Sequence, residues 1–206
     1  MASTTRRRSA QVGRPTTAEA GILAATRRLL VNGASFTEMG VQEICAEAGV
    51  ARSTFYSHFR DKIDLILRLT TDLTGSAFET TTAWEPADGL DRLAETFENV
   101  LRIYRDQAPL RRAITEVATY DVSVREVWAN ELKQFTDRTI EMIRTEQKAG
   151  RAPATIDAVA VTRVVVVGGE QAIVDQATAG DPADDAVFAR ELAETWWYGV
   201  FRRPPG

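Results

Sequence analysis

One segment of this chain, residues 37 to 62, constrains the fold more than any other. It reads TEMGVQEICAEAGVARSTFYSHFRDK, and its apolar spacing predicts two short helices on either side of a turn at Gly49. Glycine adopts the left-handed conformation that commonly ends a helix without the steric cost of a Cβ atom. In the second helix, Phe55 and Phe59 stand four residues apart and are expected to face inward. This arrangement is typical of a helix-turn-helix, the layout of many DNA-reading modules.

The outward face of the second helix carries hydroxyl, imidazole and guanidinium groups that suit contacts with a duplex. Asp61 is predicted to cap the next helix, because its carboxylate can accept a bond from a free backbone N–H. We predict two kinds of DNA contact in this region. Base edges are assigned to Arg52, Ser53 and Thr54, and phosphates to Tyr56, His58 and Lys62.

The same segment resembles the helix-turn-helix of the tetracycline-repressor (TetR) family. The resemblance rests on Ala48-Gly49-Val50, Thr54-Phe55-Tyr56, His58-Phe59 and Lys62 and covers about residues 17 to 70. Two positions depart from the family pattern, because members usually have Ser or Thr where this chain has Gly40 and Ala51. The resemblance implies a transcriptional regulator, most often a repressor, that binds a palindromic double-stranded DNA operator as a homodimer. A small apolar or aromatic effector would release it.

Charge is distributed unevenly along the chain. Residues 1 to 60 contain eight Arg or Lys and four Asp or Glu, a net charge of +4. Residues 61 to 206 contain 17 bases and 25 acids, a net charge of −8. Because screening limits a charge's reach to about 8 to 10 Å, a locally basic region attracts phosphate whatever the total charge. A basic head on an acidic body fits DNA binding, although an ordinary acidic protein with a basic tail has the same charges.

Helical periodicity runs through the rest of the sequence, and no strand-like alternation of useful length interrupts it. We therefore predict an all-α fold with three parts. These are a flexible basic arm at 1–16, a three-helix DNA-binding head with the helix-turn-helix at 17–61, and a helical ligand-binding and dimerisation domain at 62–206. Helix 62 to 82 is expected to act as a lever between head and body. The apolar run at residues 164 to 167 is interpreted as a helix buried on several sides.

The second half of the chain has more large flat side chains than a tight helical bundle needs, which favours a ligand cavity. A plain hydrophobic core is the alternative interpretation for each of them. Trp128 and Phe135, with a tryptophan near the C-terminus, are similar to the ethionamide-resistance-regulator branch of the family, whose pocket is aromatic. The predicted ligand-binding residues are Phe97, Leu101, Tyr104, Trp128, Phe135 and Trp196. Where that branch has polar groups on the penultimate helix, this chain has Val166 and Gly169.

The resemblance also implies a homodimer formed through the last two helices. On the first of them, Gly168 and Gly169 each cost about 1 kcal/mol relative to Ala, a cost offset if they let another helix approach closely. The matching stripe on the last helix consists of Phe188, Leu192, Thr195, Trp196 and Gly199. Completion of the monomer core is the other use for these residues.

Catalysis and metal binding are not predicted. His58 is the only histidine and Cys45 the only cysteine, so neither a nitrogen and sulfur metal site nor a nucleophile–histidine pair in a pocket is expected. No phosphate-cradling glycine motif occurs, and no cofactor is expected. With no disulfide framework, no signal sequence and no membrane span, the predicted location is the cytoplasm. The rival reading is a helical small-molecule carrier or enzyme without specific DNA binding.

Overall fold

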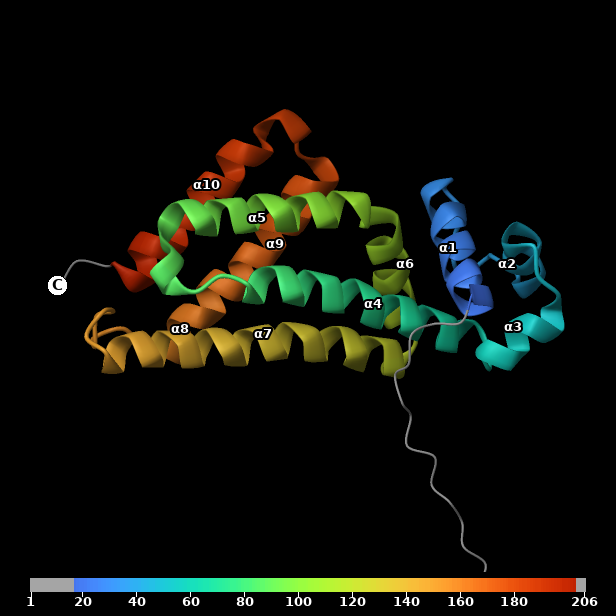
Figure 1. Ribbon diagram of the computed structural model, residues 1–206, viewed down its shortest axis with the longest axis horizontal. Coiled ribbons are helices and arrows are strands. Elements are labelled where there is room, and N and C mark those ends of the chain that lie inside the picture. The colour runs from blue at the N-terminus through green and yellow to red at the C-terminus, as the bar shows by residue number, and fades with distance from the viewer. Residues whose placement is uncertain (1–16, 203–206) are drawn as a thin grey trace, which may run out of the picture.

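The computed structural model describes residues 17–202, apart from the side chains of residues 76–82 and 131. A small helical head stands at one end of a longer helical body (Figure 1). Residues 17–202 contain no strand, and the predicted all-α fold is confirmed. The basic arm predicted at residues 1–16 lies outside the described residues.

The helix predicted at residues 62 to 82 has these same bounds in the structure. The head consists of α1 (Thr17–Val31), α2 (Val41–Ala48) and α3 (Arg52–His58). The body contains α4 (Lys62–Thr82), α5 (Gly89–Asp106), α6 (Ala108–Ala118), α7 (Val122–Lys148), α8 (Ala158–Thr162), α9 (Gly168–Ala179) and α10 (Asp185–Trp196). Two π-helical stretches, η2 (Arg163–Val167) and η4 (Trp197–Phe201), continue α8 and α10, and short 3₁₀ turns occur at η1 (Pro86–Asp88) and η3 (Pro182–Asp184).

Buried apolar side chains form two cores. The head core joins α1, α2 and α3 to the first half of α4, but it also includes α6 and the start of α7 through Leu110, Ile114 and Val124. The body core is built from α5, α9, α10 and the second half of α7. The domain boundary predicted between residues 61 and 62 therefore does not coincide with a boundary in packing, because α6 follows in sequence but packs with the head.

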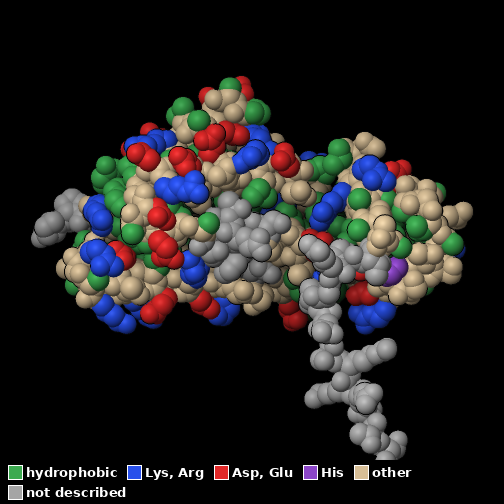
Figure 2. Space-filling model, in the orientation of Figure 1, with side chains coloured by type: hydrophobic (Ala, Val, Ile, Leu, Met, Phe, Trp, Pro, Cys, Tyr) green, Lys and Arg blue, Asp and Glu red, His purple; other side chains and the backbone are tan. Residues whose placement is uncertain are grey.

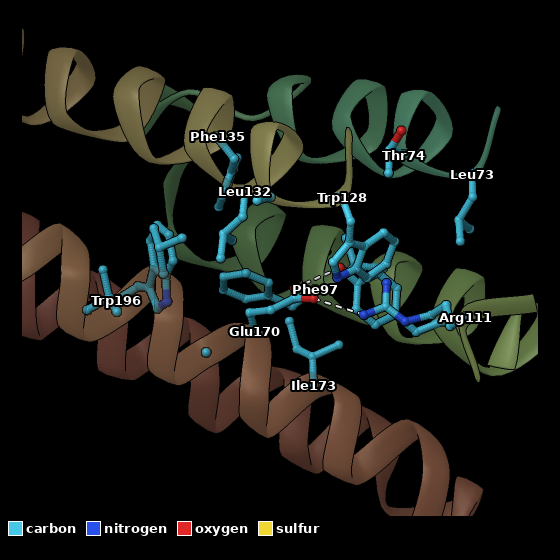
Figure 3. Close-up of a pocket in the computed structure, with 16 residues that line it drawn as sticks. Leu73, Thr74, Phe97, Arg111, Trp128, Leu132, Phe135, Glu170, Ile173 and Trp196 are labelled. Atoms are coloured by element: carbon cyan, nitrogen blue, oxygen red, sulfur yellow. Dashed lines mark hydrogen bonds and ion pairs between the residues drawn. The ribbon is translucent and has the colours of Figure 1, made fainter. Parts of the chain in front are cut away.

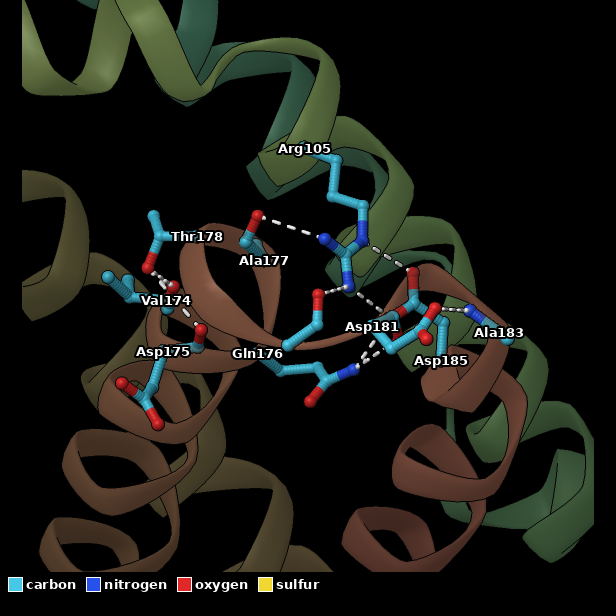
Figure 4. A network of polar contacts seen from close by, with 10 residues as sticks. Arg105, Val174, Asp175, Gln176, Ala177, Thr178, Asp181, Ala183 and Asp185 are labelled. Atoms are coloured by element: carbon cyan, nitrogen blue, oxygen red, sulfur yellow. Dashed lines mark hydrogen bonds and ion pairs between the residues drawn. The ribbon is translucent and has the colours of Figure 1, made fainter.

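A polar network holds the turn between α9 and α10 against α5 (Figure 4). Arg105 donates from Nε and Nη2 to the two carboxylate oxygens of Asp185, both at 2.7 Å. Its Nη1 and Nη2 also donate to the backbone carbonyls of Ala177 at 3.2 Å and Gly180 at 3.1 Å. A guanidinium with four such bonds fixes where α9 and α10 lie on α5.

The valine run at residues 164 to 167 departs from the sequence prediction. Val165 and Val166 are buried as expected, whereas Val164 is 71% exposed and Val167 is 51% exposed. The helix is thus buried on one side only, and the other side is an apolar surface. Gly169, Phe188, Leu192 and Trp196 were predicted to face a second chain, but all four pack within this chain. Their inward direction follows from the helical phase, which places the exposed Val187 and Tyr198 on the opposite side of the last helix.

Candidate functional site

The turn between α2 and α3 has the geometry that the sequence predicts. Gly49 has φ 66° and ψ 32°, the left-handed conformation, and its N–H donates to the carbonyl of Ala46. The next amide, of Val50, donates to Cys45 at 3.0 Å. These two bonds satisfy carbonyls that the end of α2 leaves free. The side chain of Ile44 on α2 is fully buried in the head core.

Helix α3 separates an anchoring face from an open face. Phe55 and Phe59 are buried, with ring centroids 5.5 Å apart. On the other side Arg52 and Ser53 are exposed, and Tyr56 is 49% exposed with its hydroxyl 3.4 Å from Nη2 of Arg52. The remaining two predicted contact residues of this helix, Thr54 and His58, are half-buried. The arrangement presents five predicted DNA-binding residues on one short helix.

Lys62 occupies a different environment from these five residues. Its Nζ donates to the backbone carbonyls of Phe36 at 2.7 Å, Thr37 at 3.1 Å and Met39 at 2.5 Å. Because an ammonium group has three N–H bonds, these carbonyls account for all of its donors. Burial lowers the pKa of Lys62 below its ordinary value. The side chain therefore fastens the loop between α1 and α2 to the first turn of α4, whose N-cap, Asp61, accepts a bond from Asp64 at 2.8 Å as predicted.

Charged side chains cover the head and body unequally. On the face drawn in Figure 2, acidic side chains are more numerous on the body than on the head. One acid of the head, Glu47 on α2, is paired with Arg28 of α1 at 2.7 Å. This pair links α1 to α2. The exposed Arg52 of α3 offers a positive group to a phosphate or base.

A cavity of about 190 Å³ lies in the body, between the two apolar cores. Its walls come from α4, α5, α6, α7, the η2–α9 segment and α10. Five of the six predicted ligand-binding residues line it, namely Phe97, Tyr104, Trp128, Phe135 and Trp196. The sixth, Leu101, does not, because it is fully buried in the body core. Leu73 and Thr74 complete the wall on α4, the helix that continues into the head.

The cavity has an aromatic end and a polar end (Figure 3). Trp196 packs edge-on against Phe97, with ring centroids 5.5 Å apart, and lies 6.2 Å from Phe135. At the other end Arg111 of α6 donates to Glu170 of α9 at 2.9 Å. The sequence prediction missed this polar end, because it looked for polar groups at Val166 and Gly169 and not at the neighbouring Glu170.

Two further features of the described residues concern metal ligands and membrane spans. No cluster of three or more His, Cys, Asp or Glu side chains that could hold a metal ion occurs among them. None of the helices in the described part of the chain is long and apolar enough to cross a membrane. Cys45 is buried in the head core, and this burial raises the pKa of its thiol.

Two family models match the two parts of the chain. The model "Bacterial regulatory proteins, tetR family" matches residues 22–69, which contain the helix-turn-helix. The model "Transcriptional regulator EthR, C-terminal domain" matches residues 93–201, which is more than half of the chain. The chain belongs to the TetR family. Its C-terminal domain is of the EthR type, so the branch suggested by the aromatic residues is confirmed.

Curated transcriptional regulators resemble the chain in sequence. It is 30% identical over 143 residues to the HTH-type transcriptional regulator EthR of Mycolicibacterium smegmatis, a match that covers 68% of this chain and 65% of the relative. The EthR of Mycobacterium tuberculosis is 28% identical over 151 residues, which cover 68% of this chain and 66% of that protein. The chain thus spans just under two thirds of the length of these curated relatives.

Solved structures of other bacterial proteins resemble the chain in fold. GusR of Salmonella enterica superposes with a TM-score of 0.73 at 22% identity and covers 93% of this chain and 98% of its own. The transcriptional regulator FadR of Bacillus subtilis, solved in complex with stearoyl-CoA, gives a TM-score of 0.68 at 15% identity and covers 85% and 96%. At these identities the likeness concerns the fold alone.

Proposed function

We propose that this TetR-family protein is a ligand-responsive transcriptional regulator, and a repressor in its basal state. The observation that carries the proposal is the division of α3, which exposes Arg52, Ser53 and Tyr56 while Phe55 and Phe59 anchor it. A helix of this kind enters the major groove and meets base edges with its outward side chains. The regulators among its relatives and structural neighbours support this function over an enzymatic one. Such a regulator acts beside the chromosome, so we propose a cytoplasmic location.

The contacts with DNA are assigned from exposure and chemistry. Arg52, Ser53 and Thr54 lie near the start of α3, the part of a recognition helix that reaches base edges. Tyr56 and His58 follow and are assigned to phosphates. For Lys62 we replace the predicted phosphate contact with a positioning role, because its donors already bond three carbonyls of the head.

We further propose that two copies pair through η2, α9 and the last helix. Val164, Val167, Val187 and Tyr198 are each more than half exposed in the single chain. Gly168 lies beside Val167 with nothing within 4 Å of a Cβ at that position, so a partner helix can approach closely there. A two-fold dimer presents its recognition helices about 34 Å apart, one turn of DNA, to a palindromic operator.

The ligand switch rests on where the cavity lies. A molecule in the cavity touches α4, which carries the head, and α6, which packs in the head core. It therefore favours one position of the head relative to the body, and in a dimer that position changes the spacing of the two recognition helices. A ligand with different affinities for the two spacings shifts the balance between DNA-bound and free protein.

The test is retention of genomic DNA fragments by the purified full chain at two salt concentrations, followed by sequencing of the retained DNA. We expect a short, near-palindromic site to be recovered at both salt concentrations. The Arg52→Ala/Tyr56→Ala double variant is expected to lose that site, whereas Arg92→Ala, an exposed arginine on α5, keeps it. Retention that is uniform across sequences, or absent at both salt concentrations, would overturn the regulator proposal and favour a carrier or an enzyme.

The dimer is tested by sedimentation velocity of the full chain. Val167→Glu places a charge in the exposed valine surface and is expected to shift the protein towards monomer. Val31→Glu is the matched control, since Val31 on the head is also exposed, at 65%. Equal sedimentation of Val167→Glu and wild type would contradict the proposed interface.

A further inference from the structure

The polar end of the cavity contains one carboxylate with one donor on each oxygen. Tyr104 of α5 donates from its hydroxyl to Oε2 of Glu170 at 2.7 Å. Arg111 of α6 donates from Nη2 to Oε1 of the same residue at 2.9 Å. Burial, followed by the nearby Glu170 charge, raises the pKa of Tyr104, so its hydroxyl remains a donor at neutral pH. Two donors from two helices thus converge on the two oxygens of a carboxylate.

The two charged partners are held with unequal firmness. The Arg111 guanidinium lies 3.8 Å from the ring centroid of Tyr104 and 4.8 Å from that of Trp128, so aromatic faces pack on it. Its side chain is 13% exposed, against 28% for Glu170. The backbone amide of Arg111 donates to Gln107, and its guanidinium donates from Nη2 to Glu170. A guanidinium has five N–H groups, so it can also donate to another acceptor. Glu170 is therefore the replaceable partner.

An apolar chamber adjoins this polar end directly. Phe97, Leu132, Phe135 and Ile173 line it, and Figure 3 shows Glu170 and Arg111 at the border of this apolar region. The whole cavity, polar end included, has a volume of about 190 Å³, which exceeds the roughly 150 Å³ of an engineered cavity that binds benzene. A ligand with one aromatic ring and a short polar arm fits this space.

We infer that the effector is a small hydrophobic carboxylic acid, whose carboxylate replaces that of Glu170 on Arg111 and Tyr104 while its apolar body fills the chamber. The inference deepens the proposed function, since it names the ligand class of the same cavity. Glu170 turns towards solvent, which it already reaches, and keeps its charge there. The exchange also removes the ion pair between α6 and α9, and so links acid binding to the helix that packs in the head core.

Other charge types fit this end less well. A cationic ligand would meet a carboxylate that already accepts from Arg111 and Tyr104, and would bring a second positive charge beside the guanidinium. A neutral ligand would fill the apolar chamber but leave the Arg111–Glu170 pair intact, and so would gain nothing from the two converging donors. Only an anion can take the place of the Glu170 carboxylate as the acceptor for Arg111 and Tyr104.

Calorimetric titration of the full chain at pH 7 with three matched probes tests this inference. The probes are phenylacetate, phenylacetamide and phenethylamine, which share a ring and differ in charge. We expect phenylacetate to bind at least about tenfold more tightly than phenylacetamide, the ratio that a hydrogen bond to a charged group supplies. Equal affinities for these two probes, or tighter binding of phenethylamine, would overturn the inference.

Variants identify the residues responsible. Glu170→Gln is expected to bind phenylacetate about tenfold more tightly, because a neutral amide competes less strongly for a guanidinium than a carboxylate does. Arg111→Gln should lose the preference for phenylacetate and retain binding of phenylacetamide, which also reports that the cavity is intact. Arg112→Gln, an exposed neighbour on α6, is the matched control and should bind as wild type does. An undiminished preference in Arg111→Gln refutes the assignment.

The titration results and the DNA-retention result test two different proposals. Retention of an operator by ligand-free protein tests DNA binding alone, whereas the titrations test the cavity alone. Failure of wild type and Glu170→Gln to bind any of the three probes would overturn the ligand class and leave the operator result unaffected.

Discussion

The head and the body of this molecule carry their candidate sites in opposite ways. In the head, the proposed DNA contacts stand on the outside of a solid core in which Ile44 and Phe55 are completely buried. In the body, the proposed ligand contacts face inward around a cavity whose walls come from six segments. The head site therefore depends on one short stretch of sequence, whereas the body site depends on how distant helices meet. Four predictions test this contrast.

The largest expected effect comes from removing an anchor of the head. Phe55→Ala should lower the free energy of unfolding by about 3 to 5 kcal/mol, because a fully buried ring leaves a void in a close-packed core. Phe135→Ala should cost at most about 2 kcal/mol, because that ring is half-buried and already borders a cavity. Urea unfolding followed by circular dichroism measures both. Equal losses would show that the body is packed as tightly as the head.

Lys62 provides the next largest effect. Lys62→Met removes three bonds to backbone carbonyls and should lower the free energy of unfolding by about 1 to 3 kcal/mol. If Lys62 positions the head without contacting DNA, the variant should keep the wild-type slope of the logarithm of the operator-binding constant against the logarithm of the salt concentration. A slope smaller by about 1 would instead support the phosphate contact predicted from the sequence.

The polar network of Arg105 and Asp185 should stabilise the body less at low pH. Hydrogen bonds from Arg105 hold the pKa of Asp185 below its ordinary value. The stabilisation that the ionised Asp185 gives the folded state is therefore complete above about pH 4 and is lost as the pH falls through the lowered pKa. Asp185→Asn should therefore cost about 1 to 2 kcal/mol at pH 7 and progressively less below pH 4. Thermal unfolding of both proteins from pH 7 to pH 3 measures the difference. A difference independent of pH would mean that the ion pair contributes nothing.

Two glycines give the smallest effects, with opposite signs. Gly49→Ala should cost about 1 to 2 kcal/mol, because φ is 66° at this position. Gly169→Ala should instead stabilise the body by up to about 1 kcal/mol. A Cβ there would lie 3.5 Å from Trp196 and 3.6 Å from Leu192, which are ordinary contact distances. Thermal melting compares the two variants, and destabilisation by Gly169→Ala would show that the α9–α10 contact has no room for a methyl group.

The head could be predicted almost residue by residue because its determinants are local. The turn at Gly49, the inward pair Phe55 and Phe59, and the cap at Asp61 each depend on neighbours fewer than five residues away. Lys62 is the exception, since its partners lie 23 to 26 residues earlier in the chain. Periodicity alone gave no sign of those carbonyls.

Prediction of the body was good for helices and weaker for the direction of side chains. Five of the six residues predicted from aromatic content line the cavity. Leu101 and Phe135 belong to similar apolar stripes, and only the meeting of helices decides which of them borders a void. The Arg111–Glu170 pair spans 59 residues, so no local pattern reveals it. The exposed Val164 and Val167 were missed because a run of four valines has no polar face from which to read a helical phase.

The placement of α6 in the head core has a consequence for how such a protein can change over evolutionary time. Cavity residues on α5 and α9 can be exchanged for others with little effect on the packing that supports α3, so ligand preference can drift while the operator stays the same. Arg111 does not have this freedom, because it stands on the helix whose Ile114 and Val117 are fully buried in the head core. Substitutions along α6 alter both ends of the molecule at once, and the same holds for α4, whose Leu73 lines the cavity and is buried in the head core. These two helices are therefore the slowest parts of the cavity wall to diverge.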